Sequence, residues 1–146
     1  MLKIPIDVLV VDDERDFVDM LSRRLVDAGH RVRSAYDGES GLAVLDQGPC
    51  DVVILDIRMP GKDGISVLKI IKTTHPIVEV ILLTGHGTID TAVEGLKSGA
   101  FDYVQKPAVF DELLAKLEAA RSRKADHEER IRRAEARLLV RSSGDV

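Results

Sequence analysis

Hydrophobic residues follow two patterns that alternate along the chain. Short apolar runs, such as residues 51–56 (DVVILD) and 78–85 (VEVILLTG), have the length and β-branched content of buried strands. Between these runs, apolar residues recur at three- and four-residue steps, as at Ile65, Leu68 and Ile71, which is typical of a helix with one covered face. The alternation of the two patterns predicts an α/β fold.

Five such strand-and-helix units follow one another. Strict alternation with short loops indicates a parallel sheet with right-handed crossovers and helices on both faces. The first, third and fourth runs are mainly apolar without alternation, so we expect them as central strands, buried on both faces. In the fourth helix, Ile89, Ala92, Val93 and Leu96 fall on one face. Strands are predicted at residues 6–11, 30–36, 51–56, 78–85 and 101–107, and helices at 14–28, 38–48, 64–75, 89–100 and from about 109 onward.

Polar residues follow four of the predicted strands, at the edge where such sheets carry their functional sites. Asp12 and Asp13 follow the first strand, and Asp56 ends the third. Thr84 lies at the end of the fourth strand and Lys106 at the end of the fifth. Taken singly, each has an ordinary structural explanation, because an Asp after a strand is usually a turn former or a helix cap.

Taken together, these side chains indicate a reactive site. Clustered carboxylates repel one another and are tolerated where cations lie among them. Lys106 supplies one positive charge, and hard oxygen ligands with room for water suit Mg²⁺. A carboxylate can form an acyl phosphate, so Asp56 beside Mg²⁺, a hydroxyl and an ammonium has the surroundings of a phosphoryl acceptor.

Four motifs in this order resemble those of response regulator receiver domains: VVDDE, LDIRMPGKDG, LLTGHG and SGAFDYVQKP. The resemblance covers roughly residues 6–118 and is closest in motif to receivers of nitrogen-regulation-type transcriptional activators. It implies a flavodoxin-like, doubly wound, five-stranded parallel sheet of order 2-1-3-4-5 with five helices, the last one extended. It also implies a signalling protein of a two-component system rather than an enzyme.

The resemblance assigns roles to the residues at the sheet edge. Asp56 would accept a phosphoryl group from a sensor histidine kinase. The carboxylates of Asp12, Asp13 and Asp56, with the backbone carbonyl of Arg58, would hold Mg²⁺. Lys106 would pair with the phosphoryl group.

The resemblance also implies a relay. Thr84 would turn toward the phosphoryl group and Tyr103 would rotate inward, changing the surface formed by the fourth helix, the fifth strand and the fifth helix. The Lys106–Pro107 bond would be cis. Arg58 and His86 would flank the position from which water attacks the acyl phosphate.

Two other functions stay open at this point. The chain resembles receivers attached to transcriptional output domains, so it could be the N-terminal receiver fragment of a larger regulator. A Mg²⁺-dependent phosphatase with an aspartate nucleophile also uses aspartates at strand ends. Such phosphatases carry an Asp-x-Asp pattern after the first strand, whereas Asp12 and Asp13 are adjacent here.

The C-terminal part differs from the receiver region. We assign residues 1–120 to the receiver domain and 121–146 to a helical extension or linker, because neither Gly nor Pro occurs between Pro107 and Gly144. The spacings of Asp126–Arg130, Glu128–Arg132 and Glu129–Arg133 favour a helix. A solvated linker and a coiled coil that pairs two chains are both consistent with the pattern. The coiled-coil seam would comprise Leu117, Ala120, Lys124, His127, Ile131, Ala134 and Leu138.

Charge and composition narrow the functions further. Residues 1–120 hold 13 Lys and Arg against 20 Asp and Glu, which argues against nucleic-acid binding by the receiver region itself. No apolar run approaches the ~20 residues needed to span a bilayer, and the acidic start lacks a secretory signal. We therefore expect a cytoplasmic protein without a membrane partner. Cys50 is the single cysteine and is expected to be a buried, inert thiol.

Overall fold

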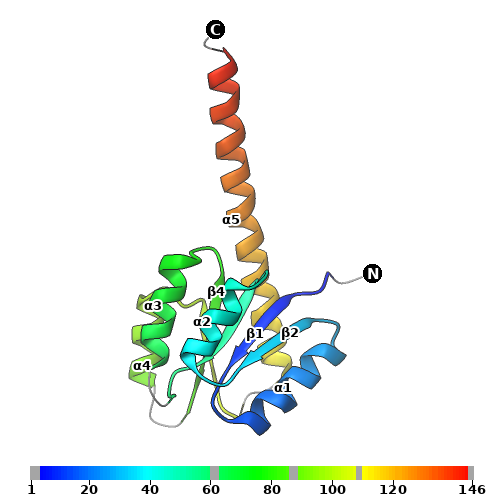
Figure 1. The fold of residues 1–146 in the computed structure, drawn as a ribbon, viewed down its shortest axis with the longest axis vertical. Helices are drawn as coiled ribbons and strands as arrows, with labels where there is room; N and C mark the ends of the chain where they lie inside the picture. Colours follow the sequence, from blue (N-terminus) through cyan, green and yellow to red (C-terminus); the bar gives the residue numbers. More distant parts are fainter. Residues whose placement is uncertain (1–3, 60–62, 86–88, 108–109, 145–146) are drawn as a thin grey trace.

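The computed structural model describes residues 4–59, 63–85, 89–107 and 110–144 (Figure 1). Five parallel strands form one sheet in the order β2-β1-β3-β4-β5. The fold is therefore the flavodoxin-like α/β fold that the sequence predicts. The strands are β1 (Asp7–Val11), β2 (Arg31–Ala35), β3 (Val52–Asp56), β4 (Glu79–Thr84) and β5 (Asp102–Gln105).

Helices cover both faces of the sheet, and each face has its own core. One core joins α1 and α5 to side chains such as Val10 and Ile54. The other joins α2, α3 and α4 to their strand neighbours, such as Leu9 and Leu55. Strands β1, β3 and β4 are buried on both faces, as their mainly apolar runs predict. The helices are α1 (Arg15–Asp27), α2 (Gly38–Asp46), α3 (Gly64–Thr74), α4 (Ile89–Lys97) and α5 (Phe110–Gly144).

Helix α4 is oriented differently from what its apolar spacing suggests. Only Ala92 of the predicted apolar face is buried, whereas 58% of Ile89 and 43% of Val93 are exposed. The reason is close packing, because a Cβ at Gly95 would lie 2.2 Å from Leu82 Cδ1. The small residues therefore face the sheet, and the large apolar residues of α4 face solvent.

Helix α5 continues beyond the domain (Figure 1). Its first part is held by ion pairs: Arg123 Nε lies 3.0 Å from Glu79 Oε2, and Lys124 Nζ lies 3.0 Å from Asp51 Oδ1. Leu117 and Ala120 are fully buried in the domain's own core. The first three positions of the predicted seam, Leu117, Ala120 and Lys124, are thus already used within the chain.

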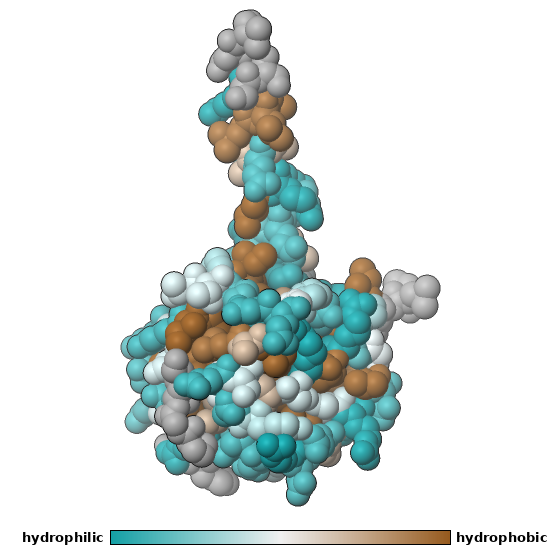
Figure 2. Space-filling model, in the orientation of Figure 1, coloured by the Kyte–Doolittle hydropathy of each residue, from teal (hydrophilic) through white to brown (hydrophobic). Residues whose placement is uncertain are grey.

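The projecting part of α5 carries mixed side chains. Figure 2 shows apolar patches on it between polar ones, and Ile131 and Leu138 are among the exposed apolar residues. Of the three predicted ion pairs, the one between Glu129 and Arg133 is present at 3.1 Å, and Glu129 also pairs with Arg132. In the described part of the chain, no helix combines the length and apolarity needed to cross a membrane.

Cys50 is buried two residues before β3, where burial raises the pKa of its thiol to about 12. The prediction of a buried thiol is confirmed, and a thiol with this pKa stays protonated and unreactive at neutral pH.

Candidate functional site

The carboxyl ends of β1 and β3 bring three carboxylates together. Ligand atoms of Asp12, Asp13 and Asp56 all lie within 4.8 Å of one another. Asp12 and Asp56 are buried, whereas Asp13 is exposed. The cluster is therefore partly enclosed by protein and open to solvent on the side of Asp13.

Backbone contacts orient the two buried carboxylates. Asp12 Oδ1 accepts a hydrogen bond from the Glu14 N–H at 2.9 Å, and Asp56 Oδ1 accepts one from the Arg58 N–H at 3.1 Å. The Oδ2 atoms of both residues lie on the side of Lys106. After Asp56 the chain turns back closely, because a Cβ at Gly64 would lie 2.4 Å from the Asp56 carbonyl oxygen.

Lys106 extends from the end of β5 into this cluster. Its Nζ lies 2.6 Å from Asp12 Oδ2 and 3.8 Å from Asp56 Oδ2. It also lies 3.3 Å from Glu14 Oε1 and 4.6 Å from the centre of the Phe17 ring. The ammonium thus neutralises part of the carboxylate charge, as expected from the sequence.

The charges at this edge perturb one another. Burial, and then the nearby charge of Asp12, raise the pKa of Asp56 to about 7, against the opposing effects of Lys106 and the Arg58 N–H. Burial lowers the pKa of Lys106, but its hydrogen bond to Asp12 and the charges of Asp56 and Glu14 outweigh that effect and raise it overall. The cluster therefore has an excess of negative charge that a further cation would relieve.

Thr84 and Tyr103 lie on the neighbouring strands. Thr84 is buried, and its Oγ1 donates a hydrogen bond to the Val104 carbonyl at 3.5 Å. The Tyr103 ring is half-buried and packs against the core beneath α4, with Lys116 Nζ 5.7 Å from the ring centre. The Lys106–Pro107 bond is cis, as predicted. His86, the other predicted neighbour of the site, lies outside the described residues.

Glu14 is a member of this site that sequence analysis did not identify. It directly follows Asp13, so the acidic VVDDE motif was its signal. Its contact with Lys106 joins residues 92 positions apart, which no local pattern reveals.

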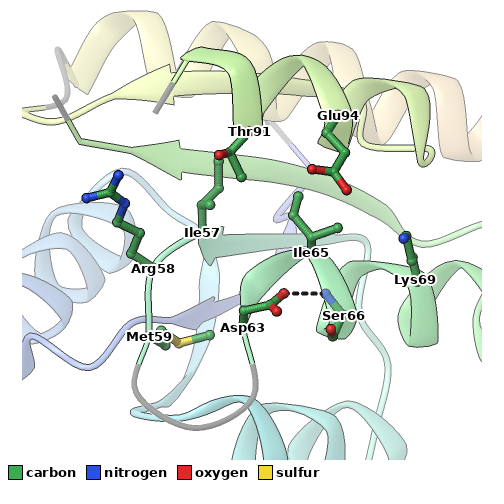
Figure 3. Close-up of a pocket in the computed structure, with 9 residues that line it drawn as sticks. All are labelled: Ile57, Arg58, Met59, Asp63, Ile65, Ser66, Lys69, Thr91 and Glu94. Atoms are coloured by element: carbon green, nitrogen blue, oxygen red, sulfur yellow. Dashed lines mark hydrogen bonds between the residues drawn. The ribbon is translucent and has the colours of Figure 1, made fainter. Parts of the chain in front are cut away.

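A cavity of about 660 Å³ lies beside the site, between α3 and α4 (Figure 3). Apolar side chains such as Ile57 and Ile65 line it together with charged ones such as Lys69 and Glu94. Arg58 is the one predicted site residue among its described lining residues, so the clustered carboxylates lie outside it. The chemistry of this molecule is concentrated at the sheet edge and not in this cavity.

The geometry suits a hard cation and an acceptor for a phosphoryl group. Carboxylate oxygens are the ligands that Mg²⁺ prefers, and the open side at Asp13 leaves room for the water and phosphate oxygens it retains. Asp56 contributes a carboxylate to the cluster, with an ammonium within 4 Å. With the ammonium so close, the Asp56 carboxylate can form an acyl phosphate.

Comparison with known proteins gives a consistent result. The family model of the response regulator receiver domain matches residues 8–118. A response regulator NtrX-like protein of Rickettsia bellii is 42% identical over 117 residues, which are 79% of this chain and 24% of that protein. The DNA-binding transcriptional regulator NtrC of Salmonella typhimurium is 43% identical over 113 residues, 77% of this chain and 24% of NtrC.

Solved structures agree with these relatives. The receiver domain of NtrX from Brucella abortus has a TM-score of 0.75 and 42% identity, over 80% of this chain and 98% of that one. NtrX from the same organism in complex with ADP has a TM-score of 0.82 and 38% identity, over 86% of this chain and 29% of that one. The chain thus spans about a quarter of the length of the curated relatives it matches.

Proposed function

The chain belongs to the response regulator receiver domain family, and from this premise we propose that Asp56 is the phosphoryl acceptor of a two-component switch. A receiver domain is a signalling module rather than an enzyme, which argues against the phosphatase alternative. The observation that carries the proposal is the gathering of Asp12, Asp13 and Asp56 within 4.8 Å, with Lys106 among them.

Phosphoryl transfer from a histidine kinase accounts for each of these groups. The Asp56 carboxylate attacks the phosphorus of the kinase's phosphohistidine, forming an O–P bond as the P–N bond breaks. The imidazole leaves with the electron pair and takes a proton from solvent. Lys106 stabilises the charge on the transferring oxygens, because its ammonium lies 3.8 Å from the accepting carboxylate.

A magnesium ion fits this donor set. Asp12, Asp13, Asp56 and the backbone carbonyl of Arg58 would hold it, and when bound it would offset the negative charge of the phosphoryl oxygens. The carboxylates themselves set the charge of the site, and the raised pKa of Asp56 reflects their crowding. A bound cation would lower that pKa and keep Asp56 in the carboxylate form that attacks phosphorus.

The signal would leave the site through Thr84 and Tyr103. Among the described residues, Thr84 Oγ1 has a single long hydrogen bond, to Val104, to give up before it turns toward a phosphoryl oxygen. Its movement would leave space that the half-buried Tyr103 ring can fill. The change would reach the α4/β5/α5 face, where Ile89 and Val93 are exposed and available to a partner.

We propose that the switch acts as a homodimer within a longer transcriptional regulator. Two surfaces support pairing: the α4/β5/α5 face and the projecting part of α5, where Ile131, Ala134 and Leu138 keep the seam spacing. The relatives named as transcriptional regulators are about four times as long as the matched region, which supports the reading of this chain as a receiver joined to an output domain.

Intact mass measurement tests the assignment of Asp56. The parent chain, incubated with acetyl phosphate and Mg²⁺, should gain one phosphoryl group, and chelation of Mg²⁺ should abolish the gain. Asp56→Asn should gain none. Asp63→Asn is the matched control, because Asp63 lies in the following loop and caps α3 through Ser66. Equal yields from the parent and Asp56→Asn would overturn the proposal.

A further inference from the structure

We propose that Glu14 is a positioning residue that competes with the phosphoryl group for Lys106 and so slows phosphoryl uptake. This inference rests on the proposed function of Asp56. It concerns a side chain next to the acidic cluster, 66% exposed and therefore free to move away without disturbing the core.

The geometry around Lys106 carries the inference. Its Nζ lies 3.3 Å from Glu14 Oε1, closer than the 3.8 Å that separates it from Asp56 Oδ2. A distance of 3.8 Å is too long for a hydrogen bond, so the ammonium makes its closer contacts with Asp12 and Glu14 and not with Asp56. A phosphoryl group on Asp56 would therefore have to compete with these carboxylates for Lys106.

The position of Glu14 in α1 supports the same role. Glu14 occupies the N-cap of α1, where a side chain ordinarily accepts a hydrogen bond from the first turn. Its side chain makes no such bond, whereas Asp37 and Asp63 do so at the N-caps of α2 and α3. The Glu14 carboxylate is directed to Lys106 instead.

Asp12 cannot play this part. It is fully buried and its other oxygen is held by the Glu14 N–H, so its carboxylate has no solvent to turn into. Glu14 differs because solvent can receive its carboxylate. When a phosphoryl group forms on Asp56, Lys106 can exchange Glu14 for a more highly charged partner.

Removing the charge of Glu14 should accelerate phosphoryl uptake. Glu14→Gln keeps the shape of the side chain and removes its charge. The rate of phosphoryl uptake should rise about two- to fivefold, which corresponds to the worth of an exposed ion pair. Asp16→Asn is the matched control, because it removes a charge from the exposed first turn of the same helix. It should leave the rate close to that of the parent.

A double-mutant cycle separates competition for Lys106 from a general change of charge. Each chain is incubated with acetyl phosphate and Mg²⁺, and phosphoryl uptake is followed by intact mass over time. In this reaction the Asp56 O–P bond forms as the P–O bond to the acetyl group breaks and acetate leaves. Glu14→Gln should accelerate uptake in the parent but have no effect in the Lys106→Ala background.

A second measurement uses salt. The advantage of Glu14→Gln over the parent should shrink in 1 M KCl, where an exposed ion pair is screened, and Asp16→Asn should show no comparable advantage at either salt concentration. Equal rates for Glu14→Gln and the parent would overturn the inference, as would the same acceleration with Lys106→Ala or Asp16→Asn. If the parent takes up phosphoryl groups and Glu14→Gln is no faster, only this inference fails. If the parent takes up none, the proposed function fails with it.

Discussion

Replacing Asp56 by Asn should stabilise the folded chain at neutral and alkaline pH. The carboxylate of Asp56 is held in a buried cluster beside Asp12, which raises its pKa from 3.8 to about 7. The folded chain therefore holds a proton on Asp56 at pH values where the unfolded chain has released it. Between about pH 4 and 7 the folded state binds more protons than the unfolded state, so the free energy of unfolding falls as the pH rises.

The size of the stabilisation follows from the raised pKa of Asp56. Three pH units correspond to about 4 kcal/mol of stability lost above pH 7, at 1.36 kcal/mol per unit. Solvent at the open side of the cluster screens part of this repulsion, so we expect Asp56→Asn to gain about 2–3 kcal/mol at pH 8. In the parent, the Arg58 N–H donates a hydrogen bond to Asp56 Oδ1. The Asn side chain keeps an amide oxygen that can accept the same bond.

Urea unfolding with chelator present measures this directly. Circular dichroism is the suitable signal because the chain has no Trp. The stability difference between Asp56→Asn and the parent should be near zero at pH 4, grow up to pH 7 and then level off. Asp16→Asn should show no such rise, because Asp16 lies outside the cluster. A difference that is absent at pH 8, or that does not change between pH 4 and 7, would refute the reasoning.

Three further predictions concern the metal, the relay and the tail. Asp13→Asn should weaken Mg²⁺ binding at least tenfold in a calorimetric titration, since it removes one of three charged ligands; unchanged affinity would place the ion elsewhere. Thr84→Ala should still accept a phosphoryl group but lose most of the phosphorylation-dependent NMR shift of Tyr103, because a hydrogen bond to a charged acceptor is worth about 1.5–3 kcal/mol. Thr84→Ser is the control, and a full shift of Tyr103 in Thr84→Ala would contradict the relay. A chain ending at Ala125, which retains the Arg123 and Lys124 ion pairs, should be less dimeric than the full chain in analytical ultracentrifugation, and equal association would remove the tail from the interface.

The strands and the main site were predictable because they depend on local patterns, whereas the strand order came from the family resemblance. Apolar runs mark the central strands, and the rule that parallel sheets act at their carboxyl edge selected Asp12, Asp56 and Lys106 before their distances were known. The structure places the carboxylates of Asp12 and Asp56 within 4 Å of Lys106 Nζ. The position of a residue within its strand-and-helix unit therefore predicts whether it lies at the functional edge of the sheet.

Other features depend on contacts between units, which local patterns do not contain. The role of Glu14 rests on Lys106, far away in the sequence. The buried face of α4 was misjudged because Gly95 allows a close approach to Leu82, which the spacing of the large apolar residues does not reveal. The anchoring of α5 depends on Glu79, an acidic residue in an apolar run that is 1% exposed and binds both Lys72 and Arg123.

The central claim is that Asp56 itself carries the phosphoryl group, and chemical trapping tests it most directly. Borohydride reduces an acyl phosphate but not a free carboxylate, so the modified aspartate is converted to homoserine and can be located by peptide mass spectrometry. After incubation with acetyl phosphate and Mg²⁺, we predict homoserine at position 56, and none when Mg²⁺ is chelated. Homoserine at position 12 or 13 in place of 56 would contradict the account.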